Sequence, residues 1–303
     1  MSLPGNSPRR VFTAINGVLL LDKASGITSN RALQQVRHLF GAAKAGHTGT
    51  LDPLCSGLLP ICFGEATKFS GFHLTADKRY RATLLLGVTT ASGDAEGAVT
   101  TTHAVNVSAV QIAAALDACR GPQTQIPPMY SALKRDGKPL YEYARKGVEV
   151  ERAPRAIEVF DLNLIERNGD SLTVDVHCSK GTYIRVLAEK IGEILGCGAH
   201  LTALRRTASG DFSLADAMTF DQLTAMDQAQ RSTALLPVDS LLRAIPALTL
   251  SATDAHKFAL GQAIACTAAA DGTLRVYAPQ GDLLGVGTCS AGALAPKRLI
   301  ATH

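Results

Sequence analysis

The sequence predicts an α+β fold that ends in a small, mostly β C-terminal domain. Strand-like alternation of apolar and polar residues, clearest at Tyr80–Thr90 and Leu172–Cys178, is interspersed with apolar stripes at helical spacing. From about residue 247 the chain changes to short apolar runs broken by glycines, which is typical of a small β domain. The 303 residues suit two domains, and the 46% hydrophobic content excludes wholesale disorder.

The first elements are a strand, a helix and a long loop. Residues 1–14 contain three Pro or Gly residues and a basic pair, so they predict a loose tail. Residues 16–22 predict a buried strand that a turn at residues 23–26 closes. Thr28 or Ser29 can cap the following helix, whose apolar stripe runs from Leu33 to Phe40. Residues 41–60 are rich in Gly and polar residues, and they predict a loop.

The later elements complete the first domain, residues 15–246. One face of the strand at Tyr80–Thr90 carries Tyr80, and the other face begins with Arg81. Residues 110–116 predict a small helix. The strand at Leu172–Cys178 is followed by a turn at residues 180–182. A helix then opens near Thr182, with an apolar stripe from Ile184 to Leu195. Residues 247–303 form the predicted β domain.

Positive charge is concentrated in two segments, although the net charge is only +4. Residues 31–81 contain seven Lys or Arg against three acids, and residues 178–206 contain five against two. A field localised in this way indicates a cleft for a polyanion. Basic residues and tyrosines also interleave over residues 123–155. That segment is either a solvated surface excursion or an RNA-contacting lobe.

Several classes of protein are disfavoured. Trp is absent and aromatics make up 5%, which argues against a multi-site single-strand binder. Seven widely spaced cysteines predict buried thiols rather than a disulfide framework or a zinc ribbon. The eight histidines show no metal-ligand spacing, and there is no nucleophile elbow or P-loop. The glycines of residues 93–97 lack the context of a dinucleotide site. We therefore expect no cofactor and no metal.

The sequence predicts a cytoplasmic protein. Residues 7–12 faintly resemble a twin-arginine export signal, but the apolar run that follows, Val18–Leu21, is too short to serve as an export core. No apolar run approaches the ~20 residues that a membrane span requires.

The densest polar loop, Gly46–Pro53, contains a candidate catalytic aspartate. Pro53 pushes Asp52 into an extended conformation, and the glycines let the backbone approach a ligand, so Asp52 can project from a rigid turn beside His47. The alternative is an Asx-type turn in which the carboxylate only stabilises the loop.

Arg185 is a second candidate, because it lies in the first turn of the predicted helix. A cation there faces the positive end of the helix dipole, so it either reaches solvent or has an anionic partner. If that partner is Asp52, the ion pair would keep the carboxylate ionised and in place. Tyr183 and Tyr80 lie nearby in the sequence pattern, and either can be a core residue or line a rim.

Seven short blocks, taken together, resemble a known family, the bacterial TruB tRNA pseudouridine synthases. They follow the family order across residues 16–212, and the C-terminal part resembles a PUA-like domain. The blocks are residues 16–23, 26–29, 46–53, 64–68, 77–80, 180–185 and 198–207.

The resemblance implies a fold and a reaction. The fold is the pseudouridine synthase fold, with a central mixed, mainly antiparallel sheet flanked by helices, and a PUA-like RNA-binding domain at 247–303. The reaction is the isomerisation of uridine 55 in the T-loop of tRNA to pseudouridine, by base flipping. The segment at 123–155 matches the position of the family's RNA-gripping insertion.

The resemblance also implies residue roles. Asp52 is the nucleophile, and Arg185 is its ion-pair partner. Tyr80 stacks on the target base and assists proton removal at its C5. His47 enters the space that the flipped base leaves, while Tyr183 and the backbone near Leu204 line the uridine pocket. Lys23 and Lys68 are backbone or supporting contacts.

Two other functions stay open on the residues alone. In one, the chain binds or remodels RNA and the Asp52 loop is only structural. In the other, Asp52 belongs to a metal-dependent phosphoryl-transfer enzyme, although the cluster of acids that such sites need is missing. We expect the partner to be the T-arm stem-loop of tRNA and the protein to be a monomer, with no membrane association and no small-molecule cofactor.

Overall fold

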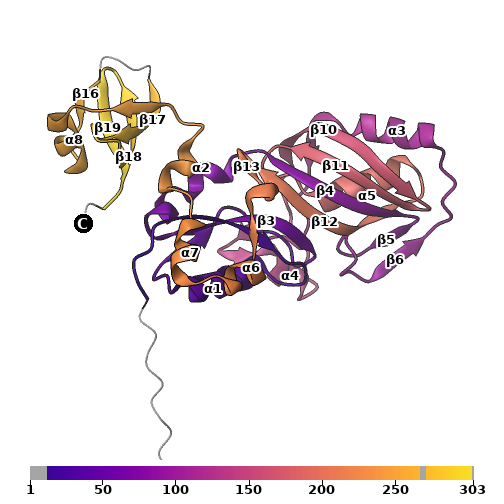
Figure 1. Cartoon of the computed structure of the whole chain (residues 1–303). Helices are drawn as coiled ribbons and strands as arrows, with labels where there is room; N and C mark the ends of the chain where they lie inside the picture. Colours follow the sequence, from indigo (N-terminus) through magenta and orange to yellow (C-terminus); the bar gives the residue numbers. More distant parts are fainter. Residues whose placement is uncertain (1–11, 267–270, 302–303) are drawn as a thin grey trace, which may run out of the picture.

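A large mixed sheet is the centre of the computed structural model, which describes residues 12–266 and 271–301 (Figure 1). Neighbouring strands are antiparallel except at two parallel pairs, β1 with β14 and β3 with β12. This arrangement confirms the predicted mixed, mainly antiparallel sheet. In spatial order the strands are β14 (Met218–Thr219), β1 (Gly17–Lys23), β3 (Cys55–Phe63), β12 (Ala199–Ser209), β4 (Lys78–Leu86), β11 (Ser171–Cys178), β10 (Arg155–Asn168) and β7 (Gly121–Gln125), with β2 (Ala45–His47) beside β3 and β13 (Phe212–Ser213) beside β12.

Helices cover the sheet and bury most of its apolar residues. None of the helices in the described residues is long and apolar enough to cross a membrane. All seven cysteines are buried, as predicted. The helices of this part of the chain are α1 (Ser29–Phe40), α2 (Ser70–Leu74), α3 (Ala109–Ala118), α5 (Ile184–Ile194), α6 (Phe220–Ala225) and α7 (Gln228–Thr233), with short 3₁₀ turns at Gly64–Lys68, Leu214–Asp216 and Val238–Leu242.

The first helix, α1, forms where the sequence predicts it, and it has a capping residue, a terminating glycine and a buried apolar stripe. The Thr28 side chain caps it by accepting a hydrogen bond from the Arg31 N–H at 3.1 Å. The helix ends at Gly41, whose φ of +66° is the left-handed conformation that glycine adopts easily. Its predicted stripe, including Val36 and Phe40, is buried against β1 and β3.

The loop predicted over residues 41–60 is wrong, because β2 and most of β3 lie there. The sequence of β3 contains Gly57 and Pro60, two residue types that are typical of loops. Gly57 is needed because β3 runs tightly beside β12: its φ is +99°, and a Cβ there would lie 2.3 Å from the Arg206 carbonyl oxygen. The strand predicted over Tyr80–Thr90 also divides. Gly87, with a φ of +82°, separates β4 from β5 (Val88–Thr90), which pairs with β6 (Val99–Thr102).

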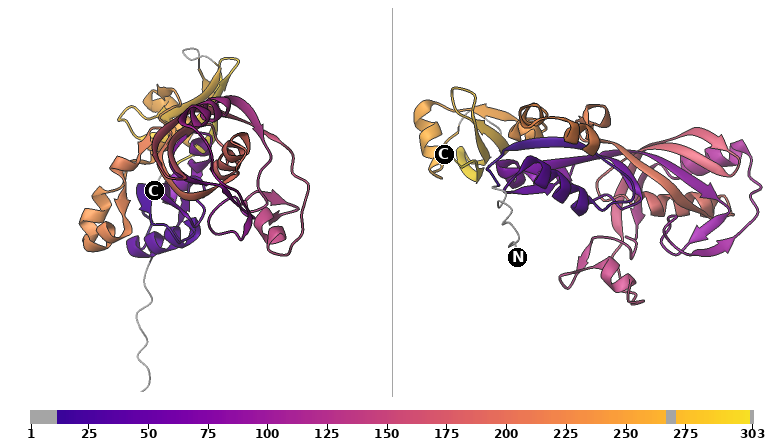
Figure 2. Two further views of the ribbon diagram at one scale, coloured as in Figure 1. Left: turned by 90° about the vertical axis from the view of Figure 1, so that its right-hand side faces the viewer. Right: turned by 60° about the horizontal axis from the view of Figure 1, so that its bottom comes forward.

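A lobe of residues 126–154 projects from the body of the molecule (Figure 2). It contains the small strands β8 (Lys134–Arg135) and β9 (Lys138–Pro139) and the helix α4 (Leu140–Ala144). Its two ends lie side by side, because Gln125 of β7 pairs with Arg155 of β10. The lobe is therefore an insertion on a closed, sheet-bound neck, and the predicted excursion is slightly wider than the part that leaves the sheet.

The C-terminal part forms a second sheet with its own core, as predicted. The strand order is β15 (Ala247–Thr249), β17 (Gly272–Tyr277), β18 (Leu283–Ser290), β19 (Ala293–Leu299) and β16 (Ile264–Ala265), and α8 (Ala252–Ala259) packs Phe258 into that core. Residues 267–270, within the predicted domain, lie outside the described residues, as do residues 1–11 of the predicted tail and residues 302–303.

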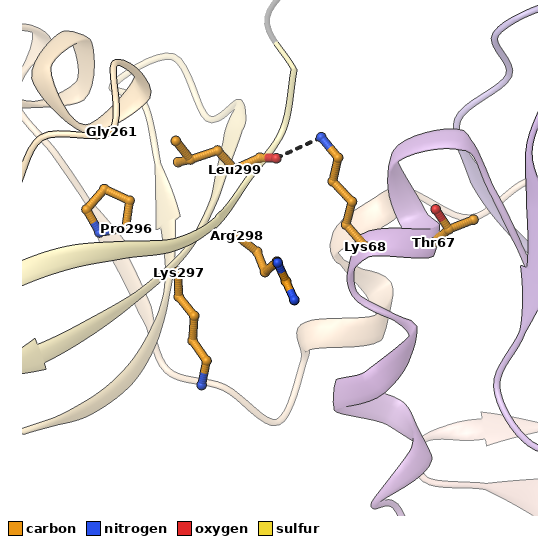
Figure 3. Close-up of a pocket in the computed structure, with 7 residues that line it drawn as sticks. All are labelled: Thr67, Lys68, Gly261, Pro296, Lys297, Arg298 and Leu299. Carbon is orange, nitrogen blue, oxygen red and sulfur yellow. Dashed lines mark hydrogen bonds between the residues drawn. The ribbon is translucent and has the colours of Figure 1, made fainter. Parts of the chain in front are cut away.

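Polar contacts join this sheet to the body. The Lys68 ammonium donates to the Leu299 carbonyl at 3.0 Å, and the Ala301 N–H donates to Glu65 Oε2 at 2.7 Å. Figure 3 shows the Lys68 contact at a cavity of about 510 Å³, which Lys297 and Arg298 also line. The Tyr277 hydroxyl donates to Asp239 Oδ2 at 2.7 Å. These contacts seat the C-terminal sheet against the 3₁₀ turns of the body.

His73, on α2, makes the fold sensitive to acid. It is buried against Phe212, and its Nε2 lies 3.1 Å from the Ser209 hydroxyl. Burial, aided by the Lys78 charge, lowers the pKa of His73 to about 4. The unfolded chain takes up this proton near pH 6.5, so stability falls as the pH drops from 6.5 to 4. We expect a loss of about 2 kcal/mol by pH 4.5, and less in His73→Gln. Thermal unfolding at pH 7 and pH 4.5 tests this, and an identical pH dependence in the two proteins would contradict it.

Candidate active site

The loop that carries Asp52 is held rigidly by the segment that starts α1. The Ser29 hydroxyl donates to the Leu51 carbonyl at 3.0 Å and accepts from the Leu51 N–H at 2.8 Å. The Gly26 N–H donates to the Pro53 carbonyl at 2.8 Å. The Asp52 carbonyl itself accepts from the Cys55 N–H at the start of β3. The backbone on both sides of Asp52 is therefore fixed, while its side chain remains 40% exposed.

Arg185 lies opposite this carboxylate, on the second residue of α5. Its Nη2 lies 2.9 Å from Asp52 Oδ2, which places the two sequence candidates together as an ion pair. The guanidinium is only 5% exposed and also donates to the carbonyls of Ser92, at 3.1 Å, and Tyr130, at 2.6 Å. A buried guanidinium group with this many hydrogen-bond partners is held in one orientation. Arg185 therefore holds the Asp52 carboxylate in a defined position.

Asp94 is a site residue that the sequence reasoning missed. Its carboxylate is 5% exposed, and its Oδ2 lies 3.5 Å from Arg185 Nε. The other oxygen, Oδ1, accepts hydrogen bonds from the Ser92 hydroxyl and from the Glu96 N–H. The buried arginine is thus shared between an inner, buried carboxylate and an outer, exposed one. The sequence does contain a sign of this residue, because Asp94 is an acid within the glycine-rich stretch 93–97, but that stretch was considered only as a dinucleotide site.

Two cavities meet at the Asp52–Arg185 pair. The inner cavity, of about 240 Å³, is lined by Tyr80, Tyr183 and Leu204. The outer cavity, of about 760 Å³, is lined by His47 and reaches the projecting lobe. Asp52 and Arg185 line both. The structure therefore brings together every residue that the resemblance placed in catalysis or uridine binding.

The strand pairing explains why these residues converge. Leu204 on β12 lies beside Cys55 of β3, just after the Asp52 loop, and Tyr80 of β4 pairs with Arg206 of β12. Tyr183 is the N-cap residue of α5, so it precedes Arg185 by two positions. Three neighbouring strands and one helix start thus present their functional residues at the same end of the sheet.

Positive charge forms the base of the inner cavity. Arg206 is 1% exposed and donates from Nε to the Leu58 carbonyl at 2.7 Å. Burial lowers the pKa of Lys78 to about 8, with the charge of Arg206 acting in the same direction. Burial also raises the pKa of Tyr80 well above its ordinary value, so this phenol is neutral at physiological pH. Burial lowers the pKa of His47, which favours the neutral ring.

The two supporting lysines lie outside these cavities. Lys23 is buried and donates to the carbonyls of Ala24 and Ile27, at 2.9 and 2.7 Å, so it stabilises the turn before α1. Lys68 lies at the junction with the C-terminal sheet. Within residues 12–266 and 271–301, no group of three or more His, Cys, Asp or Glu side chains is placed to hold a metal ion.

Comparison with known proteins decides the family. The model for the N-terminal domain of TruB family pseudouridylate synthases matches residues 37–184. A model for the C-terminal domain of tRNA pseudouridylate synthase B matches residues 185–243, and one for the C-terminal region of pseudouridine synthase II TruB matches residues 246–300. This chain belongs to the TruB family. As a pseudouridine synthase the enzyme is an isomerase, because its product contains the same atoms as its substrate.

Relatives of this TruB enzyme match along almost its whole length. The tRNA pseudouridine synthase B of Dechloromonas aromatica (strain RCB) is 54% identical over 293 residues, which covers 96% of this chain and 98% of that protein. The corresponding protein of Thiobacillus denitrificans is 53% identical over 289 residues, covering 95% and 97%. A solved Cbf5–Nop10–Gar1 complex contains a chain with the same fold, at a TM-score of 0.74 and 23% identity, covering 97% of this chain and 91% of that one.

Proposed function

We propose that this TruB enzyme isomerises uridine 55 in the T-loop of tRNA to pseudouridine, with Asp52 as the nucleophile. The observation that carries the proposal is the Asp52–Arg185 ion pair, 2.9 Å apart, at the point where a base-sized cavity opens into a wider one. The names of the closely similar relatives, tRNA pseudouridine synthase B, support tRNA as the substrate.

The reaction suits a site built around one ionised carboxylate. The N1–C1′ bond breaks, the base rotates, and C5 bonds to C1′, so atoms balance without a redox step or a group donor. The carboxylate assists at C1′, at C6 or first at the ribose, and each route needs it unprotonated. Arg185 orients the carboxylate toward the cavity, because it pairs with Asp52 while two backbone carbonyls hold the guanidinium in place.

Base flipping is the step that the two cavities suit. The flipped uracil enters the inner cavity, where Tyr80 stacks on it and assists proton removal at C5. Tyr183 and the backbone of Leu204 line the same space. His47, in the outer cavity, enters the gap left in the RNA loop. Extruding a base costs a few kcal/mol, which contacts to the RNA backbone offset.

Basic residues beyond the site supply those contacts. The projecting lobe carries Lys134, Arg135 and Arg145, and Arg145 also lines the outer cavity. We assign the lobe to gripping the T-arm, residues 15–246 to the catalytic domain and residues 247–303 to a PUA-like RNA-binding domain. Of the two roles expected for Lys68, we assign it the supporting one, because its ammonium pairs with Glu65 and donates to the Leu299 carbonyl. We further propose that the enzyme acts as a cytoplasmic monomer.

The test is conversion of a single uridine in a defined RNA. We expect the purified enzyme to form pseudouridine at position 55 of an unmodified tRNA transcript and at the equivalent position of a T-arm stem-loop, detected by carbodiimide labelling and primer extension. A transcript with cytidine at position 55 is the control. Tight binding without conversion would favour an RNA-binding protein, and loss of activity with a chelator would favour metal-dependent chemistry.

A further inference from the structure

Ser131 is a buried polar residue of the active site that the proposed function leaves without a role. It is 4% exposed, and the polar group that its hydroxyl meets is the hydroxyl of Tyr183. Its backbone is already engaged: the N–H donates to the Met129 carbonyl at 2.9 Å, and the carbonyl accepts from the Tyr141 N–H at 3.2 Å. A serine hydroxyl both donates and accepts, so the contact with Tyr183 leaves Ser131 capable of one further hydrogen bond, to a ligand.

The position of Ser131 indicates which part of a nucleotide it would meet. It lines both the inner and the outer cavity, and so do Asp52 and Arg185. A flipped nucleotide places its base in the inner cavity while its phosphates stay with the RNA chain in the outer one. The ribose then lies between the two, at the level of Asp52. Ser131 therefore lies at the level of the ribose and not at the far edge of the base.

We propose that the Ser131 hydroxyl hydrogen-bonds the ribose 2′-hydroxyl of the flipped nucleotide. The proposal rests on the proposed function and adds a residue that selects RNA at the reacting nucleotide itself. A serine hydroxyl both donates and accepts, which matches a 2′-hydroxyl that does the same. The 2′-hydroxyl is also the group that distinguishes RNA from DNA at a given position. Tyr183 is the polar neighbour of Ser131, whose hydroxyl lowers the pKa of that phenol although burial raises it overall.

The test is a binding cycle in the Asp52→Asn background, where substrate is not consumed. The ligands are two T-arm stem-loops that differ only in uridine or 2′-deoxyuridine at the target position. In Asp52→Asn we expect the deoxy substitution to weaken binding about five- to tenfold, the size of one hydrogen bond. After adding Ser131→Ala, we expect the same substitution to change the Kd less than about twofold.

Matched variants complete the cycle. Ser240→Ala removes another buried serine hydroxyl, which donates to the Pro237 carbonyl at 2.7 Å and lines neither cavity, so it should keep the full deoxy effect. Ser131→Cys retains the shape with a weaker donor, and its deoxy effect should be intermediate. With Asp52 intact, Ser131→Ala should convert the uridine RNA about tenfold more slowly in single turnover.

The outcomes separate this inference from the proposed function. An equal deoxy effect with and without the Ser131 hydroxyl overturns the inference, even if the wild-type enzyme forms pseudouridine. If the wild-type enzyme forms none in either the tRNA or the stem-loop, the proposed function fails, whatever the cycle shows.

Discussion

Asp52→Asn is expected to abolish pseudouridine formation, lowering the single-turnover rate by about 10⁴-fold or more. The amide is nearly isosteric, so the loop held by Ser29 should keep its shape. What is lost is the anionic oxygen that the ion pair with Arg185 holds ready. The measurement is carbodiimide detection of pseudouridine in a T-loop transcript, with wild type and variant assayed side by side.

Binding supplies the control for this variant. We expect the affinity of Asp52→Asn for tRNA to stay within about tenfold of the wild type. The substitution removes a negative charge, so it does not add electrostatic repulsion toward the negatively charged RNA. Asp175→Asn is the matched substitution at an aspartate whose ion pair with Arg81 is exposed, and it should retain activity. Pseudouridine formation by Asp52→Asn would discard the catalytic assignment.

Arg185→Lys is the second large effect, and it should reduce turnover by about 100- to 1,000-fold. A lysine ammonium cannot reproduce the fork that reaches Asp52, Asp94 and two carbonyls at once. Asp94 would stay buried but lose its contact with the guanidinium, and Asp52 would lose its fixed orientation. Single-turnover rates measured together with tRNA affinity test this, and affinity should fall less than about tenfold.

Arg81→Lys is the comparison, since Arg81 also forms a two-pronged pair, with Asp175 at 2.8 and 2.9 Å, but on the surface. Its turnover and affinity should both stay near wild type, because exposed ion pairs contribute little. Parallel losses of turnover and affinity in Arg185→Lys would instead show that Arg185 acts as a contact to RNA phosphate.

The sequence predicted the elements that have a clean apolar period. The helix capped at Thr28 and the strand at Leu172–Cys178 were correct because capping and alternation are local properties. The strand β3 was missed because the glycine and proline in it are explained only by its neighbours in the sheet. At Gly57 a side chain would collide with the backbone of Arg206, which lies 149 positions further along the chain.

For the candidate site, the sequence predicted the Asp52–Arg185 pair but not the further polar contacts of Arg185. The dipole argument left Arg185 either reaching solvent or pairing with an anion, with Asp52 as the candidate, and the resemblance implied that this pair forms. Nothing local indicates that Asp94 shares the same guanidinium, because β5 and β6 are required to bring its loop to α5. The sequence gives no sign of Ser131 either, since a buried hydroxyl between two cavities becomes evident only when burial and cavities are known.

The projecting lobe and its neck are tied directly to the start of α5, where Arg185 lies. Gln125, at the end of β7, accepts from the Tyr183 N–H at 2.9 Å, and inside the lobe the Tyr130 carbonyl accepts from Arg185. The lobe that we propose grips the T-arm is thus also part of the surroundings that hold Arg185 in place. Displacing or shortening the lobe would therefore remove a hydrogen bond that holds Arg185, in addition to any RNA contact that the lobe makes.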